Sequence, residues 1–471
     1  MAASRILTTL VLLLPLRVLA ADPPLANYTG TYIAADGQVA ELLDGAELVA
    51  VIDEAKYRLR RLGGDDFANP GGRKIPFHRD ADGRITEFVD GSVVYRRTGD
   101  GITEQTRALM RPRVSSDYHY RAPPDLNDGI AVGTLADSDI GVAVGEKIVR
   151  GILDETWRDV HGVLLYQRGH LVLEEYFYGY DIQRTHQMRS ATKSIVSALA
   201  GIAADRGKLD GATQPVLPLM TYPSYANPDP RKQRITLGDF LAMRSGLSCN
   251  DYDAASPGNE QRIYEFPDWV KATLDLPMAE EPGRVARYCS GGVAVVGRAT
   301  ENAVKMALPD FARDALFAPL GIKVSDWRWN YTLTNANKEY SQLHMRPRDM
   351  LKIGLLYADG GRWHGKQIVS SAWVHESLTR QSQIDGTDYG YFWWLQRFNV
   401  DTPQGERVVQ VSAAQGNGGQ KIFIVPEFDL VAVFTGGGYN AGSTPPNKIM
   451  TTILLPALMQ KSALTTSVSS P

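Results

Sequence analysis

Short apolar runs alternate with polar and glycine-containing turns along residues 22–112. The runs are Tyr28–Ile33, Val39–Leu43, Leu48–Ile52, Tyr57–Leu62, Ile75–Phe77, Arg84–Val89 and Val93–Arg97. Asp36-Gly37, Asp82-Gly83 and Asp90-Gly91 lie between some of these runs and are typical of hairpin turns, because glycine readily adopts a positive φ. The pattern predicts a small all-β domain over 22–112, followed by a linker over 113–129 that contains Pro123-Pro124.

Residues 130–462 mix two periodicities, which predicts a second domain. A long helix is expected from Ser190 to Arg206, ending before Gly207, with an apolar face made of Ile195, Val196, Leu199, Ile202 and Ala203. Strand patterns stand near both ends of the domain, over 163–166, 171–178, 422–425 and 430–434, with helical segments between them. We therefore expect an α+β fold with one antiparallel sheet flanked by helices, plus a helical subdomain.

The two ends of the chain carry different patterns. Arg5 precedes an apolar run over 6–16, and small residues follow near position 20, which predicts a secretory signal peptide over 1–21. No later apolar run is long enough to span a bilayer. A terminal helix is expected over about 446–459, and the Ser/Thr-rich residues 463–471 are expected to form a disordered tail.

The net charge bears on the choice of partner, and the cysteine content bears on whether the chain forms a disulfide. Without the predicted signal peptide, 48 basic residues face 53 acidic ones, a net charge of −5 that does not favour nucleic acid as a partner. The chain has two cysteines, Cys249 and Cys289. In an exported protein such a pair favours a disulfide, and two buried free thiols are the alternative.

Ser190 and Lys193 form an S-x-x-K pair at the start of the long predicted helix. Residues three apart lie on one helical face, so the hydroxyl and the amine are expected to be neighbours. Burial would lower the pKa of the amine, and a neutral lysine could then take the serine proton and activate a nucleophile. The alternative is a surface lysine near a serine at a helix start, since this spacing is common by chance.

Two further segments could complete such a site. Tyr288 lies in a loop before Gly291-Gly292 and could move protons between nucleophile and leaving group; the alternative is an ordinary packed tyrosine. The glycine-rich stretch 415–420 precedes a predicted strand, and its N–H groups could form an oxyanion hole with the Ser190 N–H. An ordinary glycine-rich turn is the alternative. Gly-x-Ser-x-Gly, His-Glu-x-x-His, phosphate-loop and Cys-x-x-Cys motifs are absent from the sequence.

Residues 186–194, His-Gln-Met-Arg-Ser-Ala-Thr-Lys-Ser, resemble the nucleophile motif of serine β-lactamases and penicillin-binding proteins. The stretches 235–247, 348–363 and 389–394 also resemble this family, so the resemblance covers roughly residues 140–460. It is closest to class C β-lactamase-related hydrolases, in the branch of esterases and nylon-oligomer hydrolases. It implies a β-lactamase/transpeptidase-like fold.

The resemblance also implies a mechanism. Ser190 would be acylated, Lys193 and Tyr288 would handle protons, and the N–H groups of Ser190 and Gly419 would hold the oxyanion. Ser290, Asn417 and Gly418 would contact the substrate. By this resemblance neither a metal nor an organic cofactor is needed.

Two departures from the family pattern bear on the substrate. The second motif is usually Tyr-x-Asn, whereas this chain has Tyr288-Cys289-Ser290 with a shorter last side chain. The third motif is usually Lys-Thr-Gly or His-x-Gly; here it aligns with Gly416-Asn417-Gly418, or one residue earlier with Gly418 at the oxyanion position. Either alignment lacks the cation that binds a substrate carboxylate, a loss of about 1.5–3 kcal/mol. We therefore predict weak or absent β-lactamase and carboxypeptidase activity.

Three functions follow from this reasoning. The first is an exported serine hydrolase, periplasmic or secreted, that cleaves small carboxylic esters or amides. The second is a β-lactamase or D-alanyl-D-alanine carboxypeptidase acting on peptide-like substrates. The third is a non-catalytic sensor or binding protein with the same fold. The resemblance extends weakly to the amino-terminal domain, as an accessory β domain. A Cys249–Cys289 disulfide would fix Tyr288 for catalysis.

Overall fold

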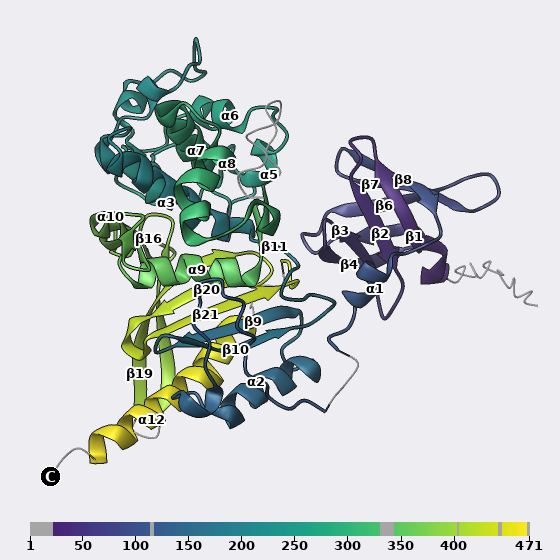
Figure 1. Cartoon of the computed structure of the whole chain (residues 1–471). Helices are drawn as coiled ribbons and strands as arrows, with labels where there is room; N and C mark the ends of the chain where they lie inside the picture. The colour runs from purple at the N-terminus through teal and green to yellow at the C-terminus, as the bar shows by residue number, and fades with distance from the viewer. Residues whose placement is uncertain (1–21, 114–116, 330–342, 403–404, 441–444, 469–471) are drawn as a thin grey trace, which may run out of the picture. The chain divides into compact units, whose positions relative to one another are not determined.

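The computed structural model describes residues 22–113, 117–329, 343–402, 405–440 and 445–468, with side chains to residue 462 (Figure 1). The chain divides into two compact units, Met1–Thr103 and Glu104–Pro471. The predicted signal peptide, 1–21, lies outside the described residues. Within the described residues, no helix combines the length and the apolar character needed to cross a membrane.

The first unit is a closed barrel of eight antiparallel strands that pair in sequence order, which confirms the predicted all-β domain (Figure 1). Aromatic side chains fill its core; the Phe88 and Tyr95 rings, for example, stack with centroids 4.7 Å apart. The strands are β1 (Gly30–Ala34), β2 (Val39–Leu43), β3 (Leu48–Ile52), β4 (Ala55–Gly63), β5 (Asp66–Ala68), β6 (Lys74–Arg79), β7 (Ile85–Asp90) and β8 (Val93–Gly99).

The segment expected as a linker is packed against the second unit. The Tyr120 hydroxyl donates to the Val172 carbonyl (2.9 Å), and Arg348 donates to the Pro124 carbonyl (2.6 Å). The short helix α1 (Glu104–Ala108) also belongs to the second unit, so the two units divide nearer the barrel than the sequence pattern indicated.

The second unit is built on an eight-stranded sheet of order β10-β9-β21-β20-β19-β18-β17-β16. The pairing of β9 with β21, next to the β10 edge, joins residues from opposite ends of the unit, with Leu164 opposite Val433. This confirms the predicted sheet made from both ends of the domain. The strands are β9 (Val160–Gln167), β10 (His170–Tyr176), β16 (Ser382–Ile384), β17 (Thr387–Tyr389), β18 (Trp394–Thr402), β19 (Gly405–Gly416), β20 (Gln420–Val425) and β21 (Leu430–Gly436).

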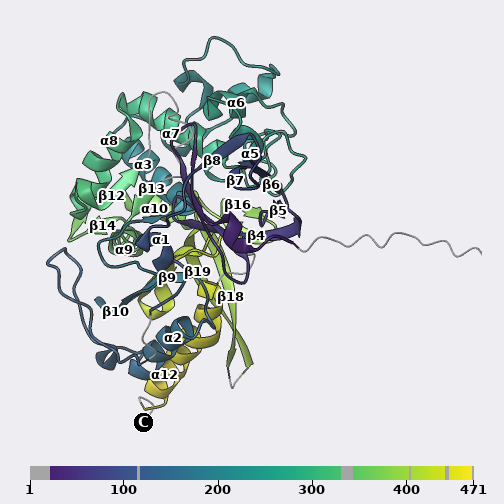
Figure 2. The same ribbon diagram turned by 90° about the vertical axis from the view of Figure 1, so that its right-hand side faces the viewer.

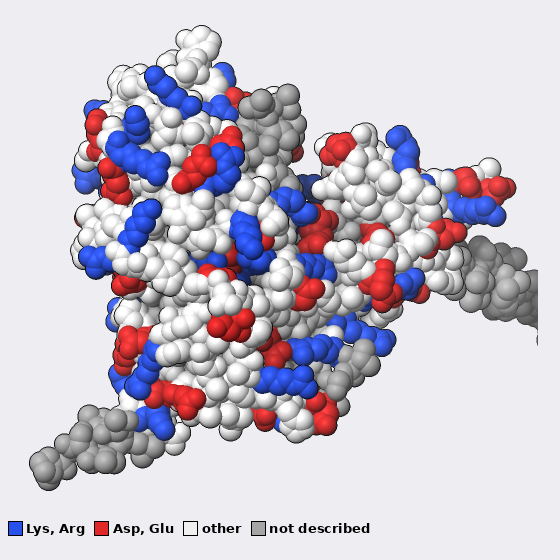
Figure 3. Space-filling model, in the orientation of Figure 1, with Lys and Arg blue, Asp and Glu red and all other residues white. Residues whose placement is uncertain are grey.

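Helices cover both faces of this sheet (Figures 1 and 2). Helix α9 (Pro347–Ala358) packs on β9, β20 and β21, and side chains on that face, such as Ile422, join the large core around α3 (Thr192–Asp205). Helix α12 (Leu455–Val468) packs on β18, and α2 (Val142–Leu153) lies beside it (Figure 2). Over the surface visible in Figure 3, basic and acidic side chains are interspersed on this unit.

The helical subdomain lies between β10 and α9 in sequence, as expected. Its remaining elements are β11 (His186–Gln187), η3 (Arg189–Ala191), α4 (Leu237–Leu241), α5 (Glu260–Ile263), α6 (Trp269–Asp275), α7 (Gly291–Val304), α8 (Leu308–Ala312), β12 (Trp327–Trp329) and β13 (Leu343–Met345). After α9 come β14 (Arg362–Trp363), β15 (Lys366–Gln367) and α10 (Ser371–Ser377), and α11 (Pro445–Ile449) and η12 (Met450–Leu454) precede α12.

The carboxyl-terminal helix continues past the predicted end. Its backbone is helical to Val468, through residues 463–468 for which we expected disorder, and residues 469–471 are not described. Extending an existing helix adds one hydrogen bond per ordered residue without a new nucleation step, which favours such continuation.

A buried ion pair fastens the packed linker to the sheet and to α9. Arg348, 1% exposed, donates to both carboxylate oxygens of Glu174 on β10 (Nη2 to Oε2, 2.7 Å) and also contacts Asp128 (3.3 Å). Removing one partner leaves a buried charge uncompensated, which is far more costly than losing an exposed ion pair.

We predict that Arg348→Ala lowers the free energy of unfolding by about 3–5 kcal/mol, because it leaves the Glu174 carboxylate buried without its cation. Urea unfolding of the full chain measures this. The control is the double variant Arg348→Met/Glu174→Gln, which removes both charges and should lose less. Unfolding of Arg348→Ala at the wild-type urea concentration would contradict the prediction.

Candidate functional site

Ser190 and Lys193 meet at the amino-terminal end of a largely buried helix of the second unit. Ser190 lies in η3, which runs directly into α3. The Lys193 Nζ donates to Ser190 Oγ at 2.9 Å. Only 3% of Lys193 is exposed, because α3 is buried along most of its length. The predicted proximity of hydroxyl and amine is therefore present, in a setting that excludes most solvent.

The net shift of the Lys193 pKa is opposite in direction to the expected one. Burial alone does lower the pKa of the ammonium, but electrostatic interactions with Tyr288, Glu260 and Asp251 and a hydrogen bond to Tyr288 outweigh it, so the Lys193 pKa is raised. Nearby negative charges and hydrogen-bond acceptors stabilise the charged form of a buried lysine, and this opposes the lowering of its pKa by burial. A raised pKa favours the ammonium form of Lys193, which donates to Ser190 Oγ; the predicted role of Lys193 in proton transfer stays a prediction.

Tyr288 lies beside this pair. The Lys193 Nζ is 5.1 Å from the centroid of the Tyr288 ring. The loop that carries Tyr288 leads into α7, whose first residue must be small: a Cβ at Gly291 would lie 2.2 Å from the Thr273 hydroxyl oxygen on α6. The sequence-predicted trio of Ser190, Lys193 and Tyr288 is thus brought together.

Aromatic rings flank Tyr288 on two sides. The Tyr252 ring stacks on it with centroids 5.4 Å apart and an interplanar angle of 5°, and the Trp394 ring lies 5.7 Å away. Tyr252 is 60% exposed, so its other surface is open to solvent. Aromatic side chains of this kind offer flat apolar surface to a ligand.

A disulfide joins Cys249 to Cys289, confirming the predicted pair. Asp251 contacts the same segment: its carboxylate oxygen Oδ2 accepts from the Ser290 N–H (2.7 Å), and its own N–H donates to the Tyr288 carbonyl (2.8 Å). The segment 249–251 therefore holds the Tyr288 loop through the disulfide at Cys289 and through hydrogen bonds on both sides of it.

Gly416, at the end of β19, lies against the turn that carries Ser190. A Cβ at this position would be 2.2 Å from the Met188 carbonyl oxygen and 3.0 Å from the Arg189 Cβ. Such distances leave no room for a side chain. The close approach brings the backbone that follows Gly416 to the Ser190 turn, which the predicted oxyanion hole requires.

The other residues of the glycine-rich stretch lie in the β19–β20 turn. Gly418 and Gly419 have positive φ (92° and 101°), a conformation that favours glycine. The Asn417 side chain makes two hydrogen bonds to Asn440, one to its side-chain oxygen (2.7 Å) and one from its N–H (2.9 Å). The roles predicted for Asn417, Gly418, Gly419 and Ser290 stay predictions.

Two cations stand near this turn, although the motif itself has none. Lys421 on β20 donates to the Gln415 side-chain oxygen, and burial lowers its pKa to about 7. The Arg189 guanidinium lies 4.7 Å from the centre of the Tyr439 ring. Arg189 also has φ of 48°, which is uncommon for a residue with a side chain.

Sequence reasoning missed Asp251, Glu260 and Tyr252. Asp251 follows Cys249 by two residues, so its place beside Tyr288 could have been inferred once the disulfide was assumed. Glu260 and Tyr252 carry no signal of their own, because their positions depend on how the 250–263 loop folds.

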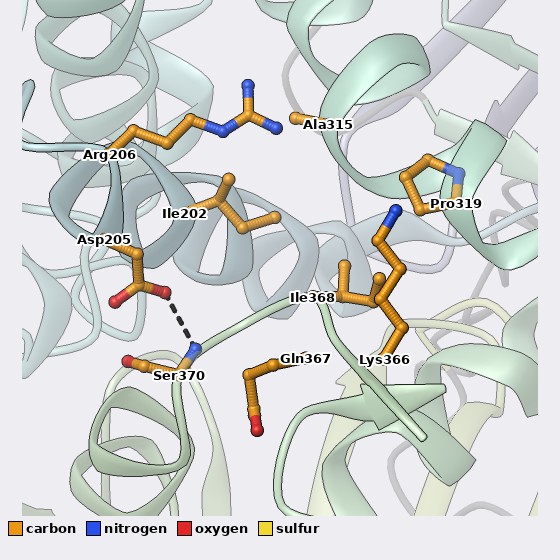
Figure 4. Close-up of a pocket in the computed structure, with 9 residues that line it drawn as sticks. All are labelled: Ile202, Asp205, Arg206, Ala315, Pro319, Lys366, Gln367, Ile368 and Ser370. Atoms are coloured by element: carbon orange, nitrogen blue, oxygen red, sulfur yellow. Dashed lines mark hydrogen bonds between the residues drawn. The ribbon is translucent and has the colours of Figure 1, made fainter. Parts of the chain in front are cut away.

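Two cavities lie elsewhere in the second unit. One of about 460 Å³ is at the far end of α3 from Ser190, where Asp205 accepts from the Ser370 N–H (2.7 Å; Figure 4). Another of about 700 Å³ lies over the β9, β20 and β21 side of the sheet and includes Trp363 and His364. Neither is lined by Ser190, Lys193 or Tyr288.

Comparisons with known proteins identify the family and the fold. The model of the beta-lactamase family, described as "Beta-lactamase", matches residues 146–442. The chain is 25% identical over 309 residues to the 6-aminohexanoate-dimer hydrolase of Paenarthrobacter ureafaciens, covering 60% of this chain and 73% of that protein.

Solved structures show the same fold at low identity. EstCE1, a hydrolase with promiscuous acyltransferase activity, superposes with a TM-score of 0.53 and 16% identity, over 70% of this chain and 99% of its own. A penicillin-binding protein homologue from Caulobacter crescentus gives a TM-score of 0.52 and 13% identity, over 70% and 99%.

We predict that Gly416→Ala lowers the rate of the reaction at Ser190 by about 10²-fold, because the added Cβ must push β19 away from the nucleophile turn. The rate of covalent labelling of Ser190 by a fluorophosphonate measures this. Gly101→Ala is the matched control, since a Cβ there meets nothing within 4 Å. Labelling of Gly416→Ala at the wild-type rate would show that the close approach is irrelevant.

We predict that the double variant Cys249→Ser/Cys289→Ser loses activity as well as about 3–4 kcal/mol of stability, because the disulfide both closes a long loop and holds Tyr288. Reduction of the purified protein should act in the same way. Unchanged activity with both thiols open to titration would count against the role in positioning Tyr288.

Proposed function

Because the chain belongs to the beta-lactamase family, we propose that it is an exported serine hydrolase that cleaves carboxylic esters or small amides through an acyl-enzyme on Ser190. The observation that carries the proposal is the 2.9 Å hydrogen bond between a buried Lys193 ammonium and the Ser190 hydroxyl, with Tyr288 alongside.

In the proposed reaction the Ser190 Oγ attacks the carbonyl carbon of the substrate. The hydroxyl proton passes to the Tyr288 oxygen, on which the Lys193 ammonium stabilises negative charge. The carbonyl oxygen becomes an oxyanion, held by backbone N–H groups of Ser190 and of the turn after Gly416, for which Gly419 is the donor suggested by the family pattern. Tyr288 then gives its proton to the leaving alcohol or amine, and water releases the acid from Ser190.

The surroundings of the site favour uncharged substrates. Tyr252 and Trp394 present aromatic surface next to Tyr288, which suits an apolar acyl or leaving group. The third motif has no lysine, and the nearby Lys421 is bonded to Gln415. Esters and amides without a carboxylate are therefore preferred in this proposal over β-lactams and cell-wall peptides.

Export is part of the proposal. The Cys249–Cys289 disulfide supports it, because such bonds persist in oxidising compartments. Amino-terminal sequencing of the protein recovered from the periplasm or medium tests it, and an intact Met1 on protein retained in the cytoplasm would refute it.

We predict that the protein hydrolyses a short-chain p-nitrophenyl ester and that Ser190→Ala abolishes this activity. Release of p-nitrophenolate is followed for both proteins at equal concentration, with circular dichroism to confirm folding. Equal rates in the two would refute the serine mechanism. Stable acylation of Ser190 by penicillin without ester turnover would instead favour the cell-wall peptidase.

A further inference from the structure

Asp251 makes three hydrogen bonds that together fix the position of the Tyr288 loop. Its N–H donates to the Tyr288 carbonyl (2.8 Å), and its Oδ2 accepts from the Ser290 N–H (2.7 Å). Its Oδ1 accepts from the Glu260 N–H at the start of α5 (2.9 Å). The Asp251 side chain therefore bridges two separate segments, and it does so next to the Cys249–Cys289 disulfide.

The charge of Asp251 also reaches the centre of the site. Among the groups that interact with it are the Glu260 carboxylate, the Lys193 ammonium and the phenol of Tyr252. Asp251 in turn raises the pKa of Lys193. A change at Asp251 thus alters both the geometry of the loop and the charge balance around Lys193.

We propose that Asp251 is a positioning residue for Tyr288, and that its ionised carboxylate holds the Tyr288–Ser290 segment in the reactive geometry. This rests on the proposed function. A carboxylate has two acceptor oxygens for the two N–H donors that face it, whereas a protonated acid must turn one oxygen into a donor. The hold on the loop is therefore stronger when Asp251 is charged.

The expected pH dependence follows from this geometry. Burial, and next the Glu260 carboxylate, raise the pKa of Asp251 to about 7. Reactivity of Ser190 should then rise as the pH increases through about 7. Stability should move the other way, because the folded state binds this proton more tightly than the unfolded chain does, so ionising Asp251 costs free energy between its ordinary pKa of 3.8 and about 7.

The test is the rate at which a fluorophosphonate labels Ser190 between about pH 5 and 9, a readout that does not depend on the natural substrate. We expect the wild type to show a rise near pH 7. Asp251→Asn should lack this rise and react about tenfold more slowly above it, because an amide keeps the shape but cannot ionise and offers one acceptor. Glu260→Gln should move the rise to lower pH, since it removes a neighbouring negative charge.

The matched control is Asp253→Asn, in the same loop. Asp253 is exposed, and its Oδ1 accepts from the Ala255 N–H (2.8 Å), a bond that asparagine can keep. The Asp253→Asn variant should show the same pH dependence of the labelling rate as the wild type. A rise near pH 7 that persists in Asp251→Asn overturns the inference, as does a rate that falls equally at every pH.

If Asp251→Asn does not fold, the test uses Glu260→Gln. If the labelling rate of that variant rises at the same pH as in the wild type, the inference is overturned. Failure of the proposed function is recognised separately: label that stays in Ser190→Ala, or no label on Ser190 in the wild type, refutes the nucleophile, and the present inference with it.

Discussion

Lys193 carries a positive charge into the interior of the protein, at a place where α3 is covered on nearly all sides. An isolated ammonium in such surroundings would lose its proton, because desolvation disfavours the charged form. Here the Tyr288 oxygen and two carboxylates stabilise it. Much of the site can be understood as what is needed to hold those groups around one cation: the disulfide, the Asp251 contacts and the small residues at the start of α7.

Strand β19 can approach the site because Gly416, at its end, has no side chain. Gly416 lets β19 lie against Met188 and Arg189, so the sheet and the helical core meet at the turn before Ser190 without an intervening Cβ. On the other side of the turn, the Ser194 hydroxyl donates to the Phe392 carbonyl (2.7 Å), which ties α3 to the segment before β18. Ser190 is thus fixed by packing on two sides before any substrate is present.

Local patterns were sufficient for much of this architecture. The apolar face of 195–203 predicted α3, and the Asp-Gly turns predicted hairpins in the barrel, where Gly37, Gly83 and Gly91 do have positive φ. The hairpin of β18 and β19 was missed even though Val409, Val411 and Ala413 alternate with more polar positions, because its outer half is exposed and polar. The pKa of Lys193 could not be predicted at all from its own segment, since Asp251 and Glu260 reach it only through tertiary folding.

The pairing of β9 with β21 has a consequence for how the protein is made. Residues 160–167 bond to residues 430–436, so this pairing closes a loop that contains most of the second unit. Contacts of such sequence separation carry a large entropic cost and form slowly. A newly made chain cannot complete this sheet until its last strands are available, so the side of β9 that pairs with β21 stays without its partner strand until late in folding.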